Sequence, residues 1–288
     1  MAYESAMIEQ LNKPWAGVVP AFVYLAIFFA VPLGYLVIVS FWTLSPQGFE
    51  ILPDWTLRNY HQFFNTKVNM IGYVRSIYIT IISVSIGVIF GYIFAYTLAF
   101  LVPKRFRLLG LLIVVLPFWT SFIVRAFSWQ LFLNETGPFA SLLRSIGVLS
   151  GNLGIVDTHV GTVIALSLFS LMIVTVSVYT VIEGIPRNLL EAARDLGGTE
   201  WSVFKEVILP LSWPGLSIAI ALSFIICFGD YVAPTLLGGG LNLVFAQLMV
   251  GSLLENFNVP MAATYAVFLL LTILLITLPI ILLGRRKY

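Results

Sequence analysis

The chain has 288 residues, of which 60% are hydrophobic and only 10% are charged, whereas ordinary soluble domains carry about 25% charged residues. So few charges cannot cover the surface of a chain of this length in water, and the sequence therefore predicts that a lipid bilayer covers much of it. The net charge of +2, with no basic stripe interleaved with aromatic residues, argues against nucleic-acid binding.

Cysteine and histidine are too sparse to indicate redox or metal chemistry. The single cysteine, Cys227, can form no intrachain disulfide. The two histidines, His61 and His159, lie far apart and have no cysteine or acidic neighbours at the spacing of metal ligands. We therefore expect no metal site and no cofactor.

Six charge-free apolar runs are each long enough to cross a bilayer core of about 30 Å as a helix. Because they are continuous and do not alternate polar with apolar residues, we expect helices and not barrel strands. The first run is predicted to be a transmembrane helix that stays in the mature protein and not a cleaved signal peptide, since no strongly basic segment precedes it and no convincing cleavage site follows it. The predicted fold is thus an all-α polytopic membrane protein, a single transmembrane domain over residues 1–288. The six runs are Val18–Phe41, Ile77–Leu101, Leu108–Val124, Val160–Ile182, Leu211–Phe228 and Met261–Leu283.

Basic residues indicate how the spans are oriented, because short cytoplasmic loops are enriched in Lys and Arg. One basic cluster lies between the second and third runs and another ends the chain, and an even number of spans places both termini on one side. We therefore expect both termini in the cytoplasm. The two clusters are Lys104, Arg105 and Arg107, and Arg285, Arg286 and Lys287.

Two segments on the outer side look more structured than connectors. Residues 128–159 contain Phe139, Leu142, Leu143, Ile146 and Leu149 at helical spacing, which predicts a helix lying in the membrane interface. Residues 230–260 contain three consecutive glycines, 238–240, and then an apolar stretch too short to span. This pattern predicts a re-entrant or half-inserted helix.

The composition of the six runs bears on the energy source for transport. A proton-coupled carrier needs ionisable groups at membrane depth, and the runs have none. Sodium coupling through backbone carbonyls at broken helices stays open. No glycine is followed by lysine anywhere in the chain, so a Walker A phosphate loop is absent, and any ATP must be bound by another chain.

The predicted cytoplasmic loop 183–210 is longer and more structured than a connector requires. Pro186 suits the start of a short helix over residues 187–196, which Gly197 and Gly198 end, one of them in the positive-φ conformation of a helix cap. Thr199 can cap a second short helix over residues 200–208. The loop is therefore expected to form two short helices with a sharp bend between them.

Each of these two helices carries an apolar stripe beside charged residues. Such a surface resembles a docking site for a partner protein. The alternative is that both stripes fold back onto the cytoplasmic ends of the protein's own helices. The stripes are Leu189, Leu190, Ala193 and Leu196, and Trp201, Phe204, Val207 and Ile208.

The loop resembles the EAA loop of ABC importer permeases. Glu191-Ala192-Ala193 is followed by Gly197 after three residues, and by Val207-x-Leu209-Pro210 after nine more; the only departure is valine for the usual isoleucine. The whole chain, including the FGDYVAPTLLGG segment after the fifth run, is similar to permeases of spermidine/putrescine importers, in particular to the first of their two permease subunits. The resemblance implies a type I ABC importer permease (MetI-like) fold in the bacterial inner membrane.

The resemblance further implies a coupling helix that inserts into a groove of an ATP-hydrolysing subunit. A stiff helix bounded by Pro186 and Gly197 suits such a lever, with Glu191 pairing with a partner's basic group or fixing the bend, while Ala192 and Ala193 permit close approach. The chain itself is then not an enzyme. The residues expected to carry coupling are Arg187, Leu190, Glu191, Ala192, Ala193, Leu196 and Gly197.

The resemblance also suggests polyamines as substrates, which carboxylates and aromatic faces can hold. The expected partners are cytoplasmic ATP-binding subunits, two copies; a second, paralogous permease; a periplasmic binding protein; and membrane lipid. The alternatives are that the chain is an ABC importer permease for another small solute, or that it is a sodium-coupled carrier. The alternative role of Trp119 and Trp129 is to form part of an interfacial aromatic belt. The alternative for Asp230 is that it is an exposed loop carboxylate or a partner of Arg125. The candidate path residues are Trp119, Trp129, Tyr179, Asp230, Tyr231 and Glu255.

Overall fold

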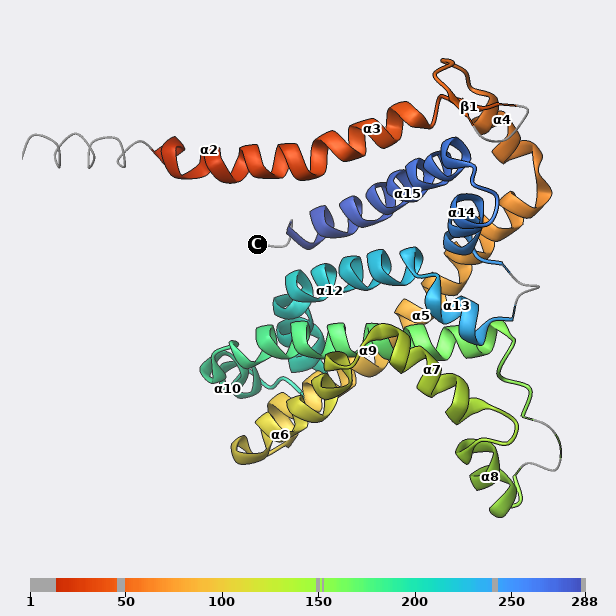
Figure 1. Ribbon diagram of the computed structural model, residues 1–288. Coiled ribbons are helices and arrows are strands. Elements are labelled where there is room, and N and C mark those ends of the chain that lie inside the picture. The colour runs from red at the N-terminus through yellow and green to blue at the C-terminus, as the bar shows by residue number, and fades with distance from the viewer. Residues whose placement is uncertain (1–13, 46–49, 149–150, 152, 240–242, 286–288) are drawn as a thin grey trace, which may run out of the picture. The chain divides into compact units, whose positions relative to one another are not determined.

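The computed structural model describes residues 14–45, 50–148, 151, 153–239 and 243–285 (Figure 1). The chain divides into two compact units, one formed by residues 1–65 and 251–267 and the other by residues 66–250 and 268–288. Five helical segments are long and apolar enough to cross a membrane, and a sharply bent pair of helices supplies a sixth. This confirms the predicted all-α architecture, with five candidate spans among the described residues, or six when the bent pair is counted as one span. The basic residues 286 and 287 lie outside the described residues.

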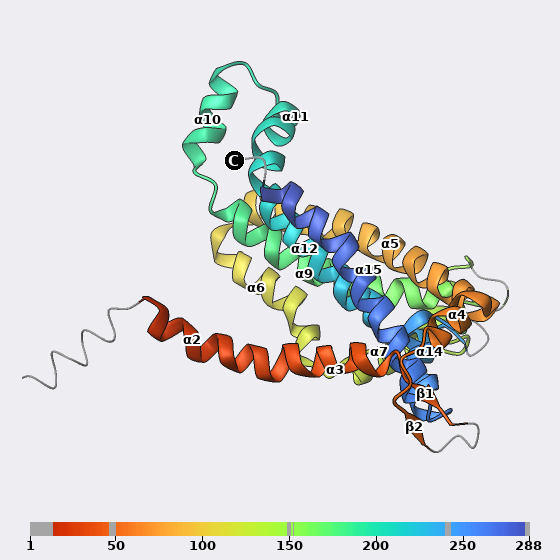
Figure 2. The same ribbon diagram turned by 90° about the horizontal axis from the view of Figure 1, so that it is seen from above.

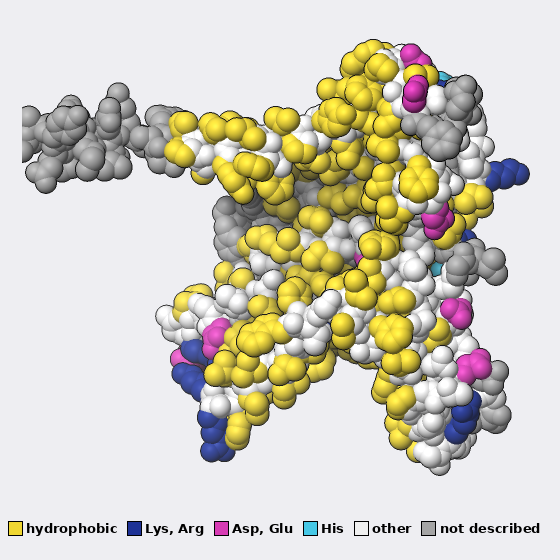
Figure 3. Space-filling view, viewed as in Figure 1, with side chains coloured by type: hydrophobic (Ala, Val, Ile, Leu, Met, Phe, Trp, Pro, Cys, Tyr) yellow, Lys and Arg dark blue, Asp and Glu magenta, His cyan; other side chains and the backbone are white. Residues whose placement is uncertain are grey.

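The smaller unit contains the first span and a short outer segment. The span runs over Val18–Val39, and its outward-facing side chains are almost all apolar (Figure 3). After it, a two-stranded antiparallel sheet pairs Thr43 with Leu52 and Leu44 with Ile51. The elements are α2 (Pro14–Leu25), the π-helical turn Ala26–Ala30, α3 (Val31–Val39), β1 (Thr43–Leu44), β2 (Ile51–Leu52) and α4 (Arg58–Asn65).

Polar side chains hold this outer segment to the end of the first span. The Asn59 amide donates to the carbonyls of Ser40 and Trp42, at 2.9 and 2.7 Å. The Thr264 hydroxyl donates to the same Ser40 carbonyl at 3.2 Å, and the buried Phe63 ring meets Tyr265 edge-on at 5.9 Å between centroids. Backbone carbonyls at a helix end need such donors, so these contacts fix where the span ends.

The larger unit contains the remaining helices. Two of its helices, α14 and α15, continue into residues of the smaller unit. The elements are α5 (Lys67–Tyr96) with the π turn Thr97–Leu101, α6 (Lys104–Val115) with the 3₁₀ turn Leu116–Trp119, α7 (Phe122–Leu133), α8 (Pro138–Ser145), α9 (His159–Glu183), α10 (Arg187–Asp195), α11 (Glu200–Val203) with the π turn Phe204–Ile208, α12 (Leu209–Gly229), α13 (Val232–Leu237), α14 (Phe245–Leu254) and α15 (Val259–Arg285).

Helices α5 and α9 pack closely and run parallel. A Cβ atom at Gly87 would clash with Ser170, and one at Gly91 would lie 2.8 Å from the Leu171 carbonyl oxygen and from the Cβ of Val174. The Thr175 hydroxyl adds a hydrogen bond of 3.3 Å to the Gly91 carbonyl. Small residues let helix backbones approach in a membrane, where packing and interhelical hydrogen bonds drive association. The Gly87–Gly91 pair therefore marks the central helix contact of this unit.

The predicted helix over Leu108–Val124 is not continuous. The third span breaks after Trp119, and its two halves meet at 99°. Pro117 has no N–H to continue the helix, and Thr120 adopts an extended backbone while its hydroxyl donates to the Pro117 carbonyl at 2.7 Å. The local hydroxyl–carbonyl bond replaces a helical hydrogen bond, so the break costs little.

The boundaries of three other predicted elements differ from the structure. The second span starts at Lys67, ten residues earlier than expected, and so includes Arg75. Residues 200–208 are not a separate short helix, because they continue into α12 as one segment of 30 residues. A π-helical turn just before Pro210 absorbs the lost hydrogen bond. The interfacial helix ends at Ser145, where Gly147 takes a φ of +74°, and Leu149 lies outside the described residues.

The segment after the fifth span forms two short helices, α13 and α14. Helix α14 has 10 residues and is too short to cross a membrane, as the sequence predicts. Gly240 lies outside the described residues. Re-entry of this segment into the bilayer stays a prediction.

Candidate functional site

Helix α10 stands apart from the spans on a short hairpin with α11, beyond the ends of α9 and α12 (Figure 2). The helix starts directly after Pro186, whose φ is −60°, and it ends at Asp195 with Leu196 as its C-cap, within one residue of the predicted end. Gly197 then takes a φ of +86°, a conformation that side chains with a Cβ rarely adopt. Both predicted boundaries of this helix are confirmed, and they make α10 a short rigid rod with defined ends.

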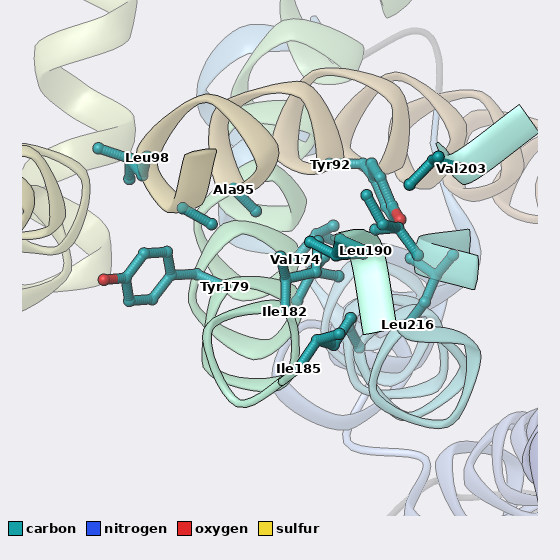
Figure 4. Close-up of a cluster of buried hydrophobic side chains, with 14 residues drawn as sticks. Tyr92, Ala95, Leu98, Val174, Tyr179, Ile182, Ile185, Leu190, Val203 and Leu216 are labelled. Carbon is teal, nitrogen blue, oxygen red and sulfur yellow. The ribbon is translucent and has the colours of Figure 1, made fainter. Parts of the chain in front are cut away.

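Two side chains hold α10 against the spans. Leu190 is 2% exposed and packs in a cluster with Tyr92, Val174 and Ile182 (Figure 4). The Arg187 guanidinium donates to the carbonyl of Ala99 at 3.1 Å and lies 5.0 Å from the centre of the Phe100 ring. These contacts fasten the rod to the C-terminal ends of α5 and α9.

The opposite face of α10 is not covered by any other part of the described residues. Leu196 is 90% exposed, and Leu189, Glu191 and Ala192 are also exposed. The predicted stripe thus divides, because Leu190 and the half-buried Ala193 face inward while Leu189 and Leu196 face outward. A large exposed apolar side chain beside an acidic one is typical of a protein contact surface.

The second half of the loop is fixed by polar contacts. The Thr199 hydroxyl caps α11 by accepting from the Ser202 N–H at 3.3 Å, as predicted. Across the bend, the Arg194 guanidinium donates to both carboxylate oxygens of Glu200, at 2.7 and 3.1 Å. The hydrogen bonds and charge of Glu200 raise the pKa of Arg194 and lower that of Glu200, so both groups of the pair are ionised at neutral pH.

The second stripe also divides between the interior and the surface. Ile208 is buried, whereas Trp201 is 70% exposed and stacks on Phe204 with ring centroids 5.4 Å apart. Trp201 and Phe204 border a groove of about 350 Å³ that Tyr92 and Tyr96 also line. Folding back onto the chain's own helices, the alternative interpretation, therefore accounts for part of each stripe, while Leu196 and Trp201 stay available to a partner.

A polar cluster lies where the third and fourth spans meet α10. The Arg107 guanidinium is 3.4 Å from the Glu183 carboxylate, and its Nε donates to the Val102 carbonyl at 3.1 Å. Tyr179, one of the predicted path residues, is buried and hydrogen-bonds to Glu183, with its ring turned away from the cluster around Val174 (Figure 4). Tyr179 therefore lies beside a carboxylate at the C-terminal end of α9.

Asp230 is placed at the opposite end of the fifth span, where it caps α13. Its two carboxylate oxygens accept hydrogen bonds from the N–H groups of Val232 and Ala233, at 2.9 and 3.1 Å. Burial outweighs these bonds and raises the pKa of Asp230 to about 6. Among the described residues no ion pair joins Asp230 to Arg125, so that alternative is wrong.

The other path candidates are not gathered at one point. Trp119 is 83% exposed at the break of the third span, and Tyr231 is exposed beside Asp230. Trp129 is half-buried and packs against the cluster that includes Leu133 and Ala233. Glu255 is exposed and belongs to the smaller unit.

Sequence reasoning did not single out the environment of Arg125. Its guanidinium carbon lies 4.7 Å from the centre of the Phe169 ring and within 6 Å of Phe118 and Phe122. One nitrogen donates to the Thr120 carbonyl at the helix break, at 3.1 Å. Arg125 thereby ties the broken span to α9. The available signal was a lone arginine among aromatic residues directly after an apolar run.

An all-α bundle of apolar spans, with a structured loop packed against two of them and short helices after the fifth span, defines a multi-pass membrane protein. A family model described as "Binding-protein-dependent transport system inner membrane component" matches residues 87–286. The chain belongs to this family of inner-membrane permeases, whose members are transport components and not enzymes.

Named relatives and a solved structure agree with this assignment. The chain is 32% identical over 249 residues to the spermidine/putrescine transport system permease protein PotB of Haemophilus influenzae, covering 85% of each chain. It is 29% identical over 160 residues to the permease protein PotC of the Escherichia coli spermidine/putrescine system, covering 56% of this chain and 60% of PotC. A bacterial alginate ABC transporter chain, crystallised with a periplasmic protein, matches with a TM-score of 0.73 at 16% identity over 99% of this chain and 97% of that one, which shows the fold.

Proposed function

We propose that the chain is one of two permease subunits of an ATP-driven importer and that α10 is its coupling helix. The observation that carries the proposal is the two-sided construction of α10. Leu190 and Arg187 fasten its inner face to the spans, while Leu196, Ala192 and Glu191 face outward. A rigid element with one fastened face and one open face transmits a partner's movement to the membrane helices.

The orientation of the chain follows from the same proposal. Lys and Arg side chains gather at the end of α6 and beside α10 (Figure 3), as the positive-inside rule requires of cytoplasmic loops. With these loops in the cytoplasm, both termini are cytoplasmic. Since the sequence has no Walker A motif, we place ATP binding and hydrolysis on separate subunits that contact α10.

Each coupling residue has a distinct task in this arrangement. Glu191 offers a carboxylate to a basic group of the ATPase, and Ala192 and Ala193 keep the helix thin enough for close approach. Gly197 sets the bend through its positive φ. Leu196 supplies a buried apolar anchor once the partner covers it, as central apolar contacts do in protein interfaces.

Polyamines are the substrates that we infer, because PotB and PotC are named for spermidine and putrescine transport. Each ammonium group of such a substrate needs a carboxylate or an aromatic face. Asp230 and Tyr231 offer both at the outer end of the fifth span, and Tyr179 lies beside Glu183 at the inner end. Trp119, Trp129 and Glu255 complete the proposed path residues.

The partners follow from the same reasoning. We propose two ATP-binding subunits in the cytoplasm and a periplasmic binding protein that docks on the outer segments. Because the chain is similar to both PotB and PotC, we propose a paralogue as the second permease.

Cysteine cross-linking tests the coupling surface directly. Cys227 is the single cysteine and is buried, so a Cys227→Ala background accepts one new thiol at a time. Ala192→Cys should cross-link to an ATPase subunit carrying a cysteine in its groove, and the yield should change on ATP addition. Lys104→Cys, exposed on the neighbouring basic loop, is the matched control. Equal yields at both positions would disprove the assignment of α10.

Competition uptake tests the substrate class separately. In proteoliposomes holding the complete transporter, unlabelled putrescine or spermidine should inhibit labelled spermidine uptake. Unrelated solutes such as sulfate, phosphonates or iron chelates should not compete. Uptake that requires a sodium gradient and no ATP would favour the sodium-coupled alternative.

A further inference from the structure

The proposed transport role does not account for a hollow and its lining residues at the outer ends of α5 and α9. A hollow of about 410 Å³ is lined by Met70, Ile71, Val74, Arg75, Tyr78 and His159. It therefore combines a guanidinium, an imidazole and a phenol with an apolar wall. None of these lining residues is acidic.

The basic groups of this hollow lie at the depth of lipid headgroups. Arg75 precedes the charge-free run that begins at Ile77 by two residues, and His159 directly precedes the run that begins at Val160. At 1.5 Å per residue, Arg75 and His159 lie within about 3 Å of the start of these two charge-free runs, although helix α5 itself begins earlier, at Lys67. Because α5 and α9 pack parallel, these two starts lie at the same end of the bundle.

The Arg75 guanidinium has further N–H groups that can donate hydrogen bonds to a ligand. One guanidinium nitrogen donates to the Leu243 carbonyl at 3.1 Å, which fixes the position of the side chain. A guanidinium carries five N–H donors in a planar fork that suits a phosphate group.

The apolar wall continues along α5 away from Arg75. Ile71, Val74 and Tyr78 are each more than half exposed, and the same helix face continues through Ile81 and Ile89. Spacings of three, four and eight residues place these side chains in one line along the helix. The line is long enough to receive an acyl chain, with its phosphate beside Arg75.

We propose that this hollow binds an anionic glycerophospholipid, with its phosphodiester on Arg75 and His159 and one acyl chain along the exposed face of α5. A zwitterionic choline lipid brings a cation toward the Arg75 guanidinium, so the anionic headgroup is preferred. With the orientation given under the proposed function, this lipid lies in the outer leaflet. The binding itself does not depend on transport.

Native mass spectrometry of the purified full-length permease tests the site. Delipidated protein is titrated with phosphatidylglycerol and, in parallel, with phosphatidylcholine of the same acyl chains. We expect the wild type to prefer phosphatidylglycerol by about tenfold, and Arg75→Gln to remove that preference. Lys67→Gln removes the same charge from the exposed start of the same helix, and we expect it to keep the wild-type preference.

A second variant and a competition experiment complete the test. Val74→Trp fills the hollow without changing charge and should displace the lipid even if Arg75→Gln fails to fold. Inorganic phosphate at millimolar concentration should not displace the lipid, since the acyl contacts contribute to binding. Equal weakening by Lys67→Gln and Arg75→Gln, displacement by phosphate, or wild-type binding in Val74→Trp would each overturn the proposal. If the hollow instead receives an acidic side chain of a partner protein, Arg75→Gln impairs assembly and leaves lipid selectivity unchanged, which also overturns it.

Discussion

The Arg187 guanidinium donates a hydrogen bond of 3.1 Å to the backbone carbonyl of Ala99, 88 residues earlier in the chain. Ala99 lies in the π-helical turn that ends the second span, and π turns leave carbonyls in unusual positions. The bond therefore joins the first residue of α10 to the C-terminal end of the second span.

Replacing Arg187 should uncouple the permease without unfolding it. Arg187→Ala removes the bond to Ala99 and the contact with the Phe100 ring, so α10 gains freedom to move without α5. We expect transport to fall by about tenfold while ATP hydrolysis by the assembled transporter loses its stimulation by substrate. Uptake and ATPase assays on the same proteoliposomes measure both. Arg194→Ala, which removes an exposed ion pair of small energetic value, is the control and should retain most transport.

Substitutions at Leu190 and Leu196 should distinguish an effect on protein stability from an effect on coupling to the ATPase. Leu190→Ala deletes a buried side chain and should cost about 2–5 kcal/mol of stability, seen as a lower unfolding temperature in detergent. Leu196→Ala removes a side chain that is 90% exposed and should leave that temperature unchanged. Transport should nevertheless fall in Leu196→Ala, since the partner loses its apolar anchor. A Leu196→Ala variant with normal transport would show that this side chain does not meet the ATPase.

Gly197 tests the geometry of the bend. At a φ of +86°, any side chain with a Cβ adds strain of roughly 1–2 kcal/mol, so Gly197→Asp should move α10 relative to α11. We expect transport to be lost while the permease stays in the membrane, as judged by membrane fractionation; Glu191→Lys should have the same outcome by reversing a contact charge. Gly184→Ala is a matched control, because Gly184 has an ordinary φ and space for a Cβ. Normal substrate-stimulated ATP hydrolysis in Gly197→Asp would contradict the proposal.

The apolar spans could be predicted from the sequence because the length of an apolar run is a local property. The sequence could not show which apolar residues of α10 face the protein interior. Leu189 and Leu196 are seven residues apart and share one helix face, whereas Leu190 and Ala193 share another, so periodicity reveals two faces and does not rank them. Only contact with Tyr92 and Val174 shows which face is buried.

The break in the third span illustrates the same limit. Pro117 and the polar pair Thr120 and Ser121 are visible in the sequence, but a proline in a membrane helix usually produces a modest kink. The angle of 99° depends on tertiary contacts, among them Arg125 packed over the Phe169 ring of α9. The capping role of Asp230 was readable in principle, because an Asp followed by a short helix with proline near its start is a capping pattern.

Transport should depend on pH through Asp230. The pKa of this carboxyl is raised to about 6 in the substrate-free protein, so it is protonated below pH 6 and ionised above it. A polyamine ammonium binds the ionised form, and binding below pH 6 must release a proton. We therefore expect the KM for spermidine to rise about tenfold for each pH unit below 6 and to be constant above pH 7. Uptake measured from pH 5 to 8 in proteoliposomes checks the profile.

Asp230→Asn should abolish this pH dependence and raise the KM at every pH, because the amide offers no negative charge. Glu135→Gln removes an exposed carboxylate from the loop after α7 and should keep the wild-type profile, which controls for general surface charge. An Asp230→Asn variant with the wild-type KM at pH 7.5 would leave Asp230 as the cap of α13 alone. The ammonium would then have to meet one of the other proposed path residues first, among them Tyr231, Trp119 and Trp129 with aromatic faces and Glu255 with a carboxylate.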